Sequence, residues 1–314
     1  MLTPAPTGED AVRDAAATPF ERQLSVDPDP DAPGRYRVDI GPEWNCPLVP
    51  HGGLVTSVAA SAMRSELDSP TQRLRSITVV FAGQVEPGPV DIDVTVLRRG
   101  RTMSQVAATL RSRGASAGHT SVAVFGAPRD GFEFTDLEPP TPPAPDTCRS
   151  FRERPDDIPE DLHFNFWDLV EGRPVDGHAW WEEYTPTTSE HSTWYRFDAP
   201  PYTREGILDP LALVTLSDTM PGGVNERMGS GLPRWLPPSA DLTVHLLNDA
   251  RSDWVFGRKR ARHAGDGYAS VEIELWDPPT LVAYGTQTMF FTFPDGPPPP
   301  DRRRPPPVPR PSRS

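Results

Sequence analysis

The chain has 314 residues, a formal net charge of -13 and a sequence pI near 5.0, a balance that argues against nucleic acid as its main partner. Only two cysteines occur, Cys46 and Cys148, so we expect neither a disulfide framework nor a zinc site, and a cytoplasmic location fits. No apolar run approaches the roughly 20 residues that a membrane helix needs, and the first residues lack the features of a signal peptide.

The first half of the chain predicts two strands, a helix and four more strands. Residues 1–17 are rich in Ala, Pro and acidic residues and are expected to be disordered. Rough alternation of polar and apolar residues predicts strands at 20–26 and 35–40. A small apolar helix is predicted at 54–67, directly after a loop that contains His51. Four alternating segments separated by short turns then predict an antiparallel sheet, with strands at 74–82, 90–98, 103–111 and 117–125.

The second half is expected to repeat this order after a proline-rich linker at 128–161. An apolar helix is predicted at 210–220, followed by a Gly/Pro loop at 221–238. A tail at 295–314, rich in Pro and Arg, is expected to be disordered. The predicted strands of this half lie before and after the helix, at 162–166, 180–184, 192–197, 239–246, 253–261, 267–276 and 281–293.

The repetition of helix and sheet predicts the fold. Residues 53–126 and 209–293 each read as an apolar helix followed by four strands, and alignment by hand places Thr78 on Thr243. A helix wrapped by a curved antiparallel sheet, occurring twice, predicts an α+β tandem (double) hotdog. We expect the N-terminal hotdog at 18–127 and the C-terminal hotdog at 162–294.

Only the second copy of the repeat carries a polar constellation. Its helix ends in a carboxylate, its first strand begins with a hydroxyl and its last strand holds an amide: Asp218, Ser239 and Gln287. The hand alignment places these positions opposite Ser61, Leu74 and Thr120 of the first copy. A duplicated scaffold with one such constellation predicts a single active site built on two halves.

These segments resemble the double-hotdog type II acyl-CoA thioesterases. The resemblance rests on Leu-Ser-Asp218, Pro-Pro-Ser239-Ala-Asp-Leu-Thr and Tyr-Gly-Thr-Gln287, and it covers roughly residues 18–294. It implies an enzyme that hydrolyses fatty acyl-CoA to fatty acid and CoA, with a water held by these three side chains. Thr243 is the alternative to Ser239 for the hydroxyl, since Thr is common at this place in the family.

The residue types suit this chemistry. Ser239 and Gln287 can each donate or accept one hydrogen bond to the water that Asp218 would activate. The oxyanion of a thioester needs N–H donors, such as those of a helix N-terminus. Gly52 and Gly53 open the first helix and allow a carbonyl group to approach closely. We therefore predict that the first half contributes His51, Gly52 and Gly53 to substrate binding, with the turn at Gly52 and Gly53 facing Asp218 of the second half.

Several alternatives remain open. The protein could be a non-catalytic acyl-CoA-binding or acyl-binding hotdog protein, and Asp218 could attack the thioester directly instead of activating water. Arg258, Arg260 and Arg262 could contact the phosphates of CoA or form a solvated turn. Pairing into a homo-oligomer is possible. No cofactor or metal is expected, since the chain has neither a Gly-rich nucleotide loop after a strand nor His/Cys ligand spacing.

Overall fold

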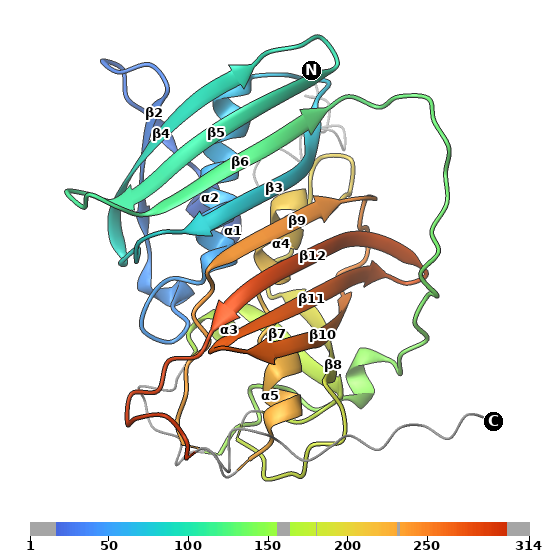
Figure 1. Cartoon of the computed structure of the whole chain (residues 1–314). Helices are drawn as coiled ribbons and strands as arrows, with labels where there is room; N and C mark the ends of the chain where they lie inside the picture. The colour runs from blue at the N-terminus through green and yellow to red at the C-terminus, as the bar shows by residue number, and fades with distance from the viewer. Residues whose placement is uncertain (1–16, 156–163, 180, 231–232, 300–314) are drawn as a thin grey trace, which may run out of the picture.

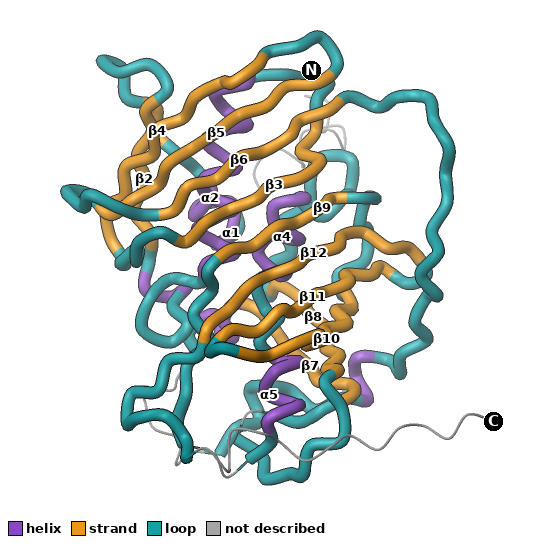
Figure 2. The backbone as a smooth tube through the Cα atoms, viewed as in Figure 1, coloured by secondary structure: helices purple, strands orange, loops and turns teal. Residues whose placement is uncertain are grey.

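One continuous antiparallel sheet joins two similar halves of the molecule (Figure 1). The computed structural model describes residues 17–155, 164–179, 181–230 and 233–299. The sheet has 12 strands in the order β1-β2-β4-β5-β6-β3-β9-β12-β11-β10-β8-β7. Each half curves around its own central helix, α2 or α4, which confirms the predicted tandem hotdog (Figure 2).

The first half is built around α2 (Gly52–Leu67), whose Leu54, Val55 and Val58 are fully buried. The predicted helix and its four following strands are present, with ends within a few residues of the expected positions. The other elements of this half are α1 (Pro19–Leu24), β1 (Asp27–Pro28), β2 (Arg35–Ile40), the short 3-10 helix Pro42–Trp44, β3 (Arg73–Phe81), β4 (Gly88–Arg98), β5 (Met103–Ser112) and β6 (His119–Gly126).

The strand predicted at 20–26 is wrong, because most of this segment forms helix α1. Thr18 and Glu21 make a capping box, in which each side chain accepts a hydrogen bond from the backbone N–H of the other residue. Pro19 occupies the first helical position, where its missing N–H has no consequence. Phe20 and Leu24, one turn apart, are both buried. The capping residues therefore decide the local structure over the apparent alternation.

The second half is built around α4 (Pro210–Ser217), in which every residue after Pro210 is buried. Its four C-terminal strands follow the prediction closely. The remaining elements are α3 (Phe166–Leu169), β7 (Val170–Asp176), β8 (Glu190–Phe197), α5 (Gly222–Met228), β9 (Asp241–Leu246), β10 (Val255–Gly265), β11 (Tyr268–Asp277) and β12 (Thr280–Phe290).

Several predictions for the second half differ from the structure. The segment 221–238 contains helix α5, and α4 ends at Ser217. The residues predicted as strand at 162–166 and 180–184 form no strand where they are described; 162, 163 and 180 lie outside the described residues. Strand β7 was missed because Gly172 and Pro174 resemble turn residues, and such residues are tolerated here because β7 is an edge strand.

From Glu138 onward, the described part of the predicted linker passes over the second half of the sheet, on the face that lies opposite the main core. There Trp194, Phe256, Trp276 and Leu281 form a second apolar cluster. The linker contributes backbone acceptors: Trp194 Nε1 donates to the carbonyl of Pro143 at 2.9 Å. This segment is therefore packed as a strap. The predicted disorder of 1–16 and 300–314, and the linker end at 156–161, lie outside the described residues.

A local two-fold axis relates the halves. Strands β3 and β9 are antiparallel neighbours, and the aligned Thr78 and Thr243 face each other across them. Below the sheet, Ser57 Oγ of α2 lies 2.9 Å from Thr215 Oγ1 of α4. Counted from the N-cap residues of the two helices, Ser57 and Thr215 occupy the same position. Equivalent residues thus meet at the axis in both layers.

The axis corrects the hand alignment at two positions. Counting along the helices from their N-caps, Asp218 corresponds to Ala60 and not to Ser61. In the sheet, Val122 of β6 and Thr286 of β12 face the two threonines at the axis, so they are equivalent. Their next residues, Ala123 and Gln287, are therefore equivalent too, and Thr120 is not the counterpart of Gln287. The first half has buried apolar residues at all three places: Ala60, Leu74 and Ala123.

Candidate active site

Helix α4 brings Asp218 into the interior between the two halves. Asp209 caps the start of this helix, since its side chain accepts a hydrogen bond from Leu211 N–H at 2.9 Å. At the other end Asp218 is the C-cap residue, directly after the last helical residue. Because α2 and α4 are antiparallel, the C-terminus of α4 lies against the N-terminus of α2.

The carboxylate of Asp218 caps helix α2 from the opposite half. His51, the N-cap residue of α2, makes no side-chain capping bond. Instead Gly53 N–H donates to Asp218 Oδ2 at 2.8 Å. A carboxylate at a helix N-terminus is stabilised by about 0.3–1 kcal/mol, and by up to about 2 kcal/mol when partly buried. The contact therefore fixes one carboxylate oxygen with backbone of the other half.

Two glycines make this approach possible. A Cβ atom on Gly53 would lie 2.5 Å from the carbonyl oxygen of Thr215 and 2.8 Å from Asp218 Cβ. A Cβ atom on Gly52 would lie 2.7 Å from Asp218 Oδ2 and 3.0 Å from Phe81 Cε1. These separations are too short for any side chain, so Gly52 and Gly53 allow the helix ends to meet.

The other oxygen of Asp218 is bound by the two predicted polar partners. Gln287 Nε2, from β12, donates to Asp218 Oδ1 at 2.5 Å, and Ser239 Oγ donates to the same oxygen at 3.3 Å. Gln287 Nε2 also donates to Ser239 Oγ at 2.6 Å. Ser239 lies just before β9 and forms an isolated bridge with Met289 of β12. Three separate elements thus converge on one carboxylate.

The amide of Gln287 has a free acceptor. Gln287 is only 3% exposed, and its Oε1 atom is buried without a hydrogen-bond donor among the described residues. Both hydrogens of its NH₂ group are used by Asp218 and Ser239. The orientation of the amide is therefore set by these two bonds, and Oε1 stays available for a donor.

The surroundings of Asp218 are mostly apolar and aromatic. The buried ring of His51 stacks on Phe166 with 4.3 Å between centroids, and its Nδ1 atom makes no bond to a described residue. Burial lowers the pKa of His51, while the charge of Asp218 acts in the opposite direction. Burial, and secondarily Asp218, raises the pKa of the Cys46 thiol well above its usual value. Neutral groups therefore surround the carboxylate at neutral pH.

The structure sorts the predicted site residues into two places. Asp218, Ser239, Gln287 and Gly53 share one hydrogen-bonded cluster, and Gly52 and His51 adjoin it. Thr243, the alternative to Ser239, instead shares a hydrogen bond of 3.0 Å with Thr78 at the two-fold axis. Among the candidate hydroxyls, only that of Ser239 contacts Asp218 in the described residues.

Two neighbours of the site were not predicted from the sequence. Phe166, which stacks on His51, falls in the segment that was predicted to be a strand. Cys46 precedes the His51 loop, and the charge of Asp218 acts on its thiol. Neither residue carries a sequence signal for these contacts, because both depend on how the halves pack.

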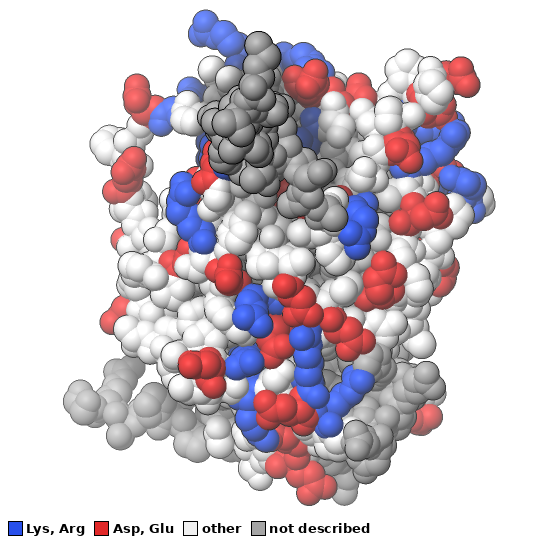
Figure 3. Space-filling view, turned by 180° about the vertical axis from the view of Figure 1, so that it is seen from behind, with Lys and Arg blue, Asp and Glu red and all other residues white. Residues whose placement is uncertain are grey.

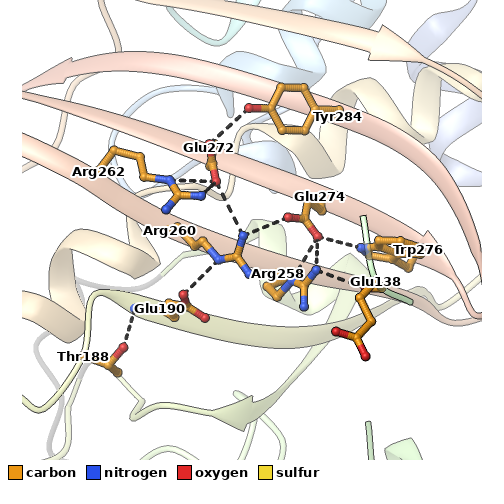
Figure 4. Close-up of polar contacts among 10 residues, drawn as sticks. All are labelled: Glu138, Thr188, Glu190, Arg258, Arg260, Arg262, Glu272, Glu274, Trp276 and Tyr284. Atoms are coloured by element: carbon orange, nitrogen blue, oxygen red, sulfur yellow. Dashed lines mark hydrogen bonds and ion pairs between the residues drawn. The ribbon is translucent and has the colours of Figure 1, made fainter. Parts of the chain in front are cut away.

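The predicted basic cluster on β10 is neutralised by carboxylates. Figure 4 shows Arg258, Arg260 and Arg262 in a row on the linker-covered face of this strand. Arg258 binds Glu274 of β11, Arg260 lies 3.0 Å from Glu190 of β8, and Arg262 binds Glu272 of β11. With every guanidinium paired, this geometry favours a structural role over binding of CoA phosphates.

Among the described residues, the rest of the molecule offers no cluster of metal ligands. Acidic and basic side chains intermingle on the face seen in Figure 3. The described residues contain no group of three or more His, Cys, Asp or Glu side chains that could hold a metal ion. No helix in the described part of the chain is long and apolar enough to cross a membrane.

Both halves match families of known enzymes. Residues 40–126 match the acyl-CoA thioesterase N-terminal domain, and residues 145–291 match the acyl-CoA thioesterase C-terminal domain. The two matches together cover most of the chain. The protein therefore belongs to the acyl-CoA thioesterase family, and it is a thioester hydrolase.

Solved structures show the same fold at low sequence identity. A hot dog fold protein of unknown function from Alicyclobacillus acidocaldarius has a TM-score of 0.74 and 21% identity, covering 89% of this chain and 100% of its own. The acyl-CoA thioesterase II TesB2 of Mycobacterium marinum has a TM-score of 0.67 and 19% identity, covering 88% of this chain and 99% of its own. The tesB protein of Mycobacterium avium subspecies paratuberculosis has a TM-score of 0.66 and 18% identity, covering 87% of this chain and 98% of its own. No curated protein sequence matches significantly.

Proposed function

We propose that this enzyme hydrolyses fatty acyl-CoA to free fatty acid and CoA with a water activated by Asp218 and oriented by Ser239 and Gln287. One observation carries the proposal. The carboxylate of Asp218 is held by Gly53 N–H, Ser239 Oγ and Gln287 Nε2, next to the buried Gln287 Oε1 that accepts no bond from the described residues. A base fixed beside an unused acceptor suits a bound water.

In this mechanism Asp218 takes one proton from the water, while the second hydrogen of the water donates a hydrogen bond to Gln287 Oε1. The oxygen then attacks the thioester carbon and forms a tetrahedral oxyanion. Collapse breaks the carbon–sulfur bond, and Asp218 returns its proton to the departing CoA sulfur. The bonds to Asp218 and Gln287 supply orientation, since they set where the attacking oxygen lies.

The first half would supply the oxyanion donor at the N-terminus of α2. Gly53 N–H is occupied by Asp218, which leaves Gly52 N–H, for which no hydrogen bond to a described residue is seen. A helix N-terminus stabilises developing negative charge. The buried His51 and its partner Phe166 would then form a wall of the substrate site. We place the reaction in the cytoplasm, with which the free Cys46 and Cys148 agree.

The test is hydrolysis of a ladder of acyl-CoAs of increasing chain length, with released CoA measured by a thiol reagent. We expect the wild type to release CoA from part of the ladder and Asp218→Asn to lose nearly all of this activity. Release by Asp218→Asn at the wild-type rate would refute the role of Asp218. Binding of acyl-CoA by the wild type without release at any chain length would instead favour the non-catalytic binding protein.

A further inference from the structure

The only lysine of the chain is buried beneath helix α5. Lys259 points inward from β10, opposite in direction to Arg258 and Arg260, and is 2% exposed. Its Nζ atom donates to Tyr195 OH at 2.8 Å and to Thr193 Oγ1 at 2.9 Å. Among the described residues it forms no ion pair. Buried lysines are rare, and one without a carboxylate partner calls for a reason.

One branch of hydrogen bonds leads from Lys259 to the residue after Asp218. An ammonium group can only donate, so the oxygen of Tyr195 accepts from Lys259 and its hydrogen points elsewhere. That hydrogen reaches Thr219 Oγ1 at 2.8 Å, and Thr219 in turn donates to the carbonyl of Leu216 at 2.9 Å. Leu216 lies in the last turn of α4, and its carbonyl also accepts the backbone N–H of Thr219 at 3.3 Å. The branch therefore ties down the turn that carries Asp218.

The other branch runs away from the site. Because Thr193 accepts from Lys259, its own hydrogen goes to His191 Nδ1 at 3.2 Å. His191 Nε2 then donates to the carbonyl of His178 at 3.2 Å, which fixes His191 as the neutral tautomer. Burial, and then the charge of Lys259, lowers the pKa of His191 well below its usual value, in agreement with this arrangement.

The neighbouring groups are arranged around the ammonium. A Cβ atom on Gly222 of α5 would lie 3.1 Å from Lys259 Nζ, so this glycine leaves room for it. The nearby carboxylate of α5, Glu226, is engaged by the backbone N–H and Nδ1 of His178, both at 2.9 Å. The position paired with Lys259 on β11 holds the apolar Ile273. The ring of Tyr184 stacks on that of His178.

We infer that Lys259 is a positioning residue for thioester hydrolysis: through Tyr195 and Thr219 it fixes the last turn of α4 and thereby the carboxylate of Asp218. The inference rests on the proposed role of Asp218. It assigns to the buried cluster a function in the reaction, although none of its members touches the substrate.

The protonation state of Lys259 decides which way the hydroxyl of Tyr195 donates its hydrogen bond. Burial lowers the pKa of Lys259 to about 7. Once deprotonated, Nζ carries a lone pair that can accept the hydrogen of Tyr195, and Thr219 then loses its donor. Positioning is therefore present while Lys259 is protonated and weakens as the pH rises through about 7. The other titratable groups facing this cluster are His191, His178, Glu226 and the tyrosine Tyr184.

Steady-state kinetics of variants test the branch. Lys259→Met and Tyr195→Phe should each lower kcat roughly ten-fold and leave KM within about two-fold, because a misplaced base slows chemistry more than binding. Thr193→Val, which cuts only the other branch, serves as the matched control and should stay within about two-fold of the wild type in both constants. Thr219→Val should reproduce the loss, and Thr219→Ser, which keeps the hydroxyl, should restore kcat. Equal kcat for Thr219→Val and Thr219→Ser would overturn the inference.

The single lysine allows a direct spectroscopic test. Protein labelled with 13Cε-lysine gives one lysine signal, and its titration should have a midpoint near 7 instead of the ordinary 10.5. In the wild type kcat should contain a component that falls through the same pH, and Lys259→Met should lack it. An unchanged kcat and an identical pH profile in Lys259→Met would refute the inference.

Asp218→Asn separates the two proposals. If it hydrolyses acyl-CoA like the wild type, the proposed function itself fails. If Asp218→Asn is inactive while Lys259→Met, folded by circular dichroism, keeps the wild-type kcat, only the positioning role fails.

Discussion

The two ends of the α2–α4 helix pair are related by the two-fold axis, yet they are capped differently. At one end Asp218 reaches across the interface and binds the N–H of Gly53. At the other end the equivalent N–H, that of Leu211, is bound by Asp209 from its own helix. The scaffold therefore offers two similar places, and the helix N-terminus that lacks its own cap is the one that recruits a carboxylate.

The residues around each end follow from this difference. Glycines at 52 and 53 let the carboxylate approach, whereas the equivalent positions hold Pro210 and Leu211, whose side chain is 2% exposed and fills the space. Asp209 is further held by an ion pair with Arg64 of α2 at 3.2 Å. One end of the helix pair is thus filled by side chains and capped by its own helix, and the other keeps a carboxylate bound by backbone and side-chain donors from both halves.

The largest expected effect contrasts the two carboxylates. Asp218→Asn should lower kcat by about 10²–10⁴, the range associated with loss of a general base. Asp209→Asn keeps an acceptor for Leu211 N–H and should leave kcat unchanged, since its side chain contacts Leu211 N–H and Arg64 and lies at the opposite end of α4 from Asp218. Release of CoA from acyl-CoA measures both. Comparable losses in the two variants would mean that the helix ends do not differ as described.

Gly53→Ala should produce the next largest effect. The added methyl group would press on the carbonyl oxygen of Thr215 and on Asp218, so the helices must move apart. We expect a loss of about 1–3 kcal/mol in the free energy of unfolding, as for other overpacked sites, together with reduced kcat. The matched control is Gly131→Ala, where an added Cβ meets nothing within 4 Å. Urea unfolding measures the stability of both variants. Equal unfolding midpoints would contradict the close approach of the two helices at Gly53.

Ser239→Ala and Thr243→Val distinguish the two candidate hydroxyls. Ser239→Ala removes a donor to Asp218 and should lower kcat roughly ten-fold, since a hydrogen bond to a charged group contributes about 1.5–3 kcal/mol. Ser239→Thr keeps the hydroxyl and should retain most of the activity. Thr243→Val removes only the bond to Thr78 and should have wild-type kinetics. If Thr243→Val lost more kcat than Ser239→Ala, the hydroxyl of the active site would be that of Thr243.

The tandem fold could be predicted from the sequence because the pattern of one apolar helix followed by four strands occurs twice. Asp218, Ser239 and Gln287 also stand out in the sequence, as polar residues on a scaffold whose first copy lacks them. The sequence placed the turn at Gly52 and Gly53 opposite Asp218, but it gave no sign that Gly53 N–H would bind the carboxylate itself. That bond joins residues 165 positions apart and depends on antiparallel helix packing. The sequence predicted that Gly53 would serve the substrate; its N–H is instead used by Asp218.

Other misses have local causes. The short segment at Phe20 alternates like a strand, but the capping box at Thr18 makes it a helix. Lys259 is flanked by arginines in the sequence and gives no sign of burial there. Strand geometry separates them, since neighbours along β10 face opposite sides, and only the packing of α5 and β8 shows what the inward lysine contacts.

The smallest expected effect concerns stability at the self-capped end. Asp209→Ala removes the cap of α4 and the ion pair with Arg64, which is half exposed and contributes little. We expect the free energy of unfolding to fall by about 1 kcal/mol, the usual loss for an N-cap, with kcat unchanged. Urea unfolding and CoA release at the same pH measure the two quantities. A loss of activity in a folded Asp209→Ala variant would show that the two helix ends are coupled, because displacement at the start of α4 would then reach Asp218 at its other end.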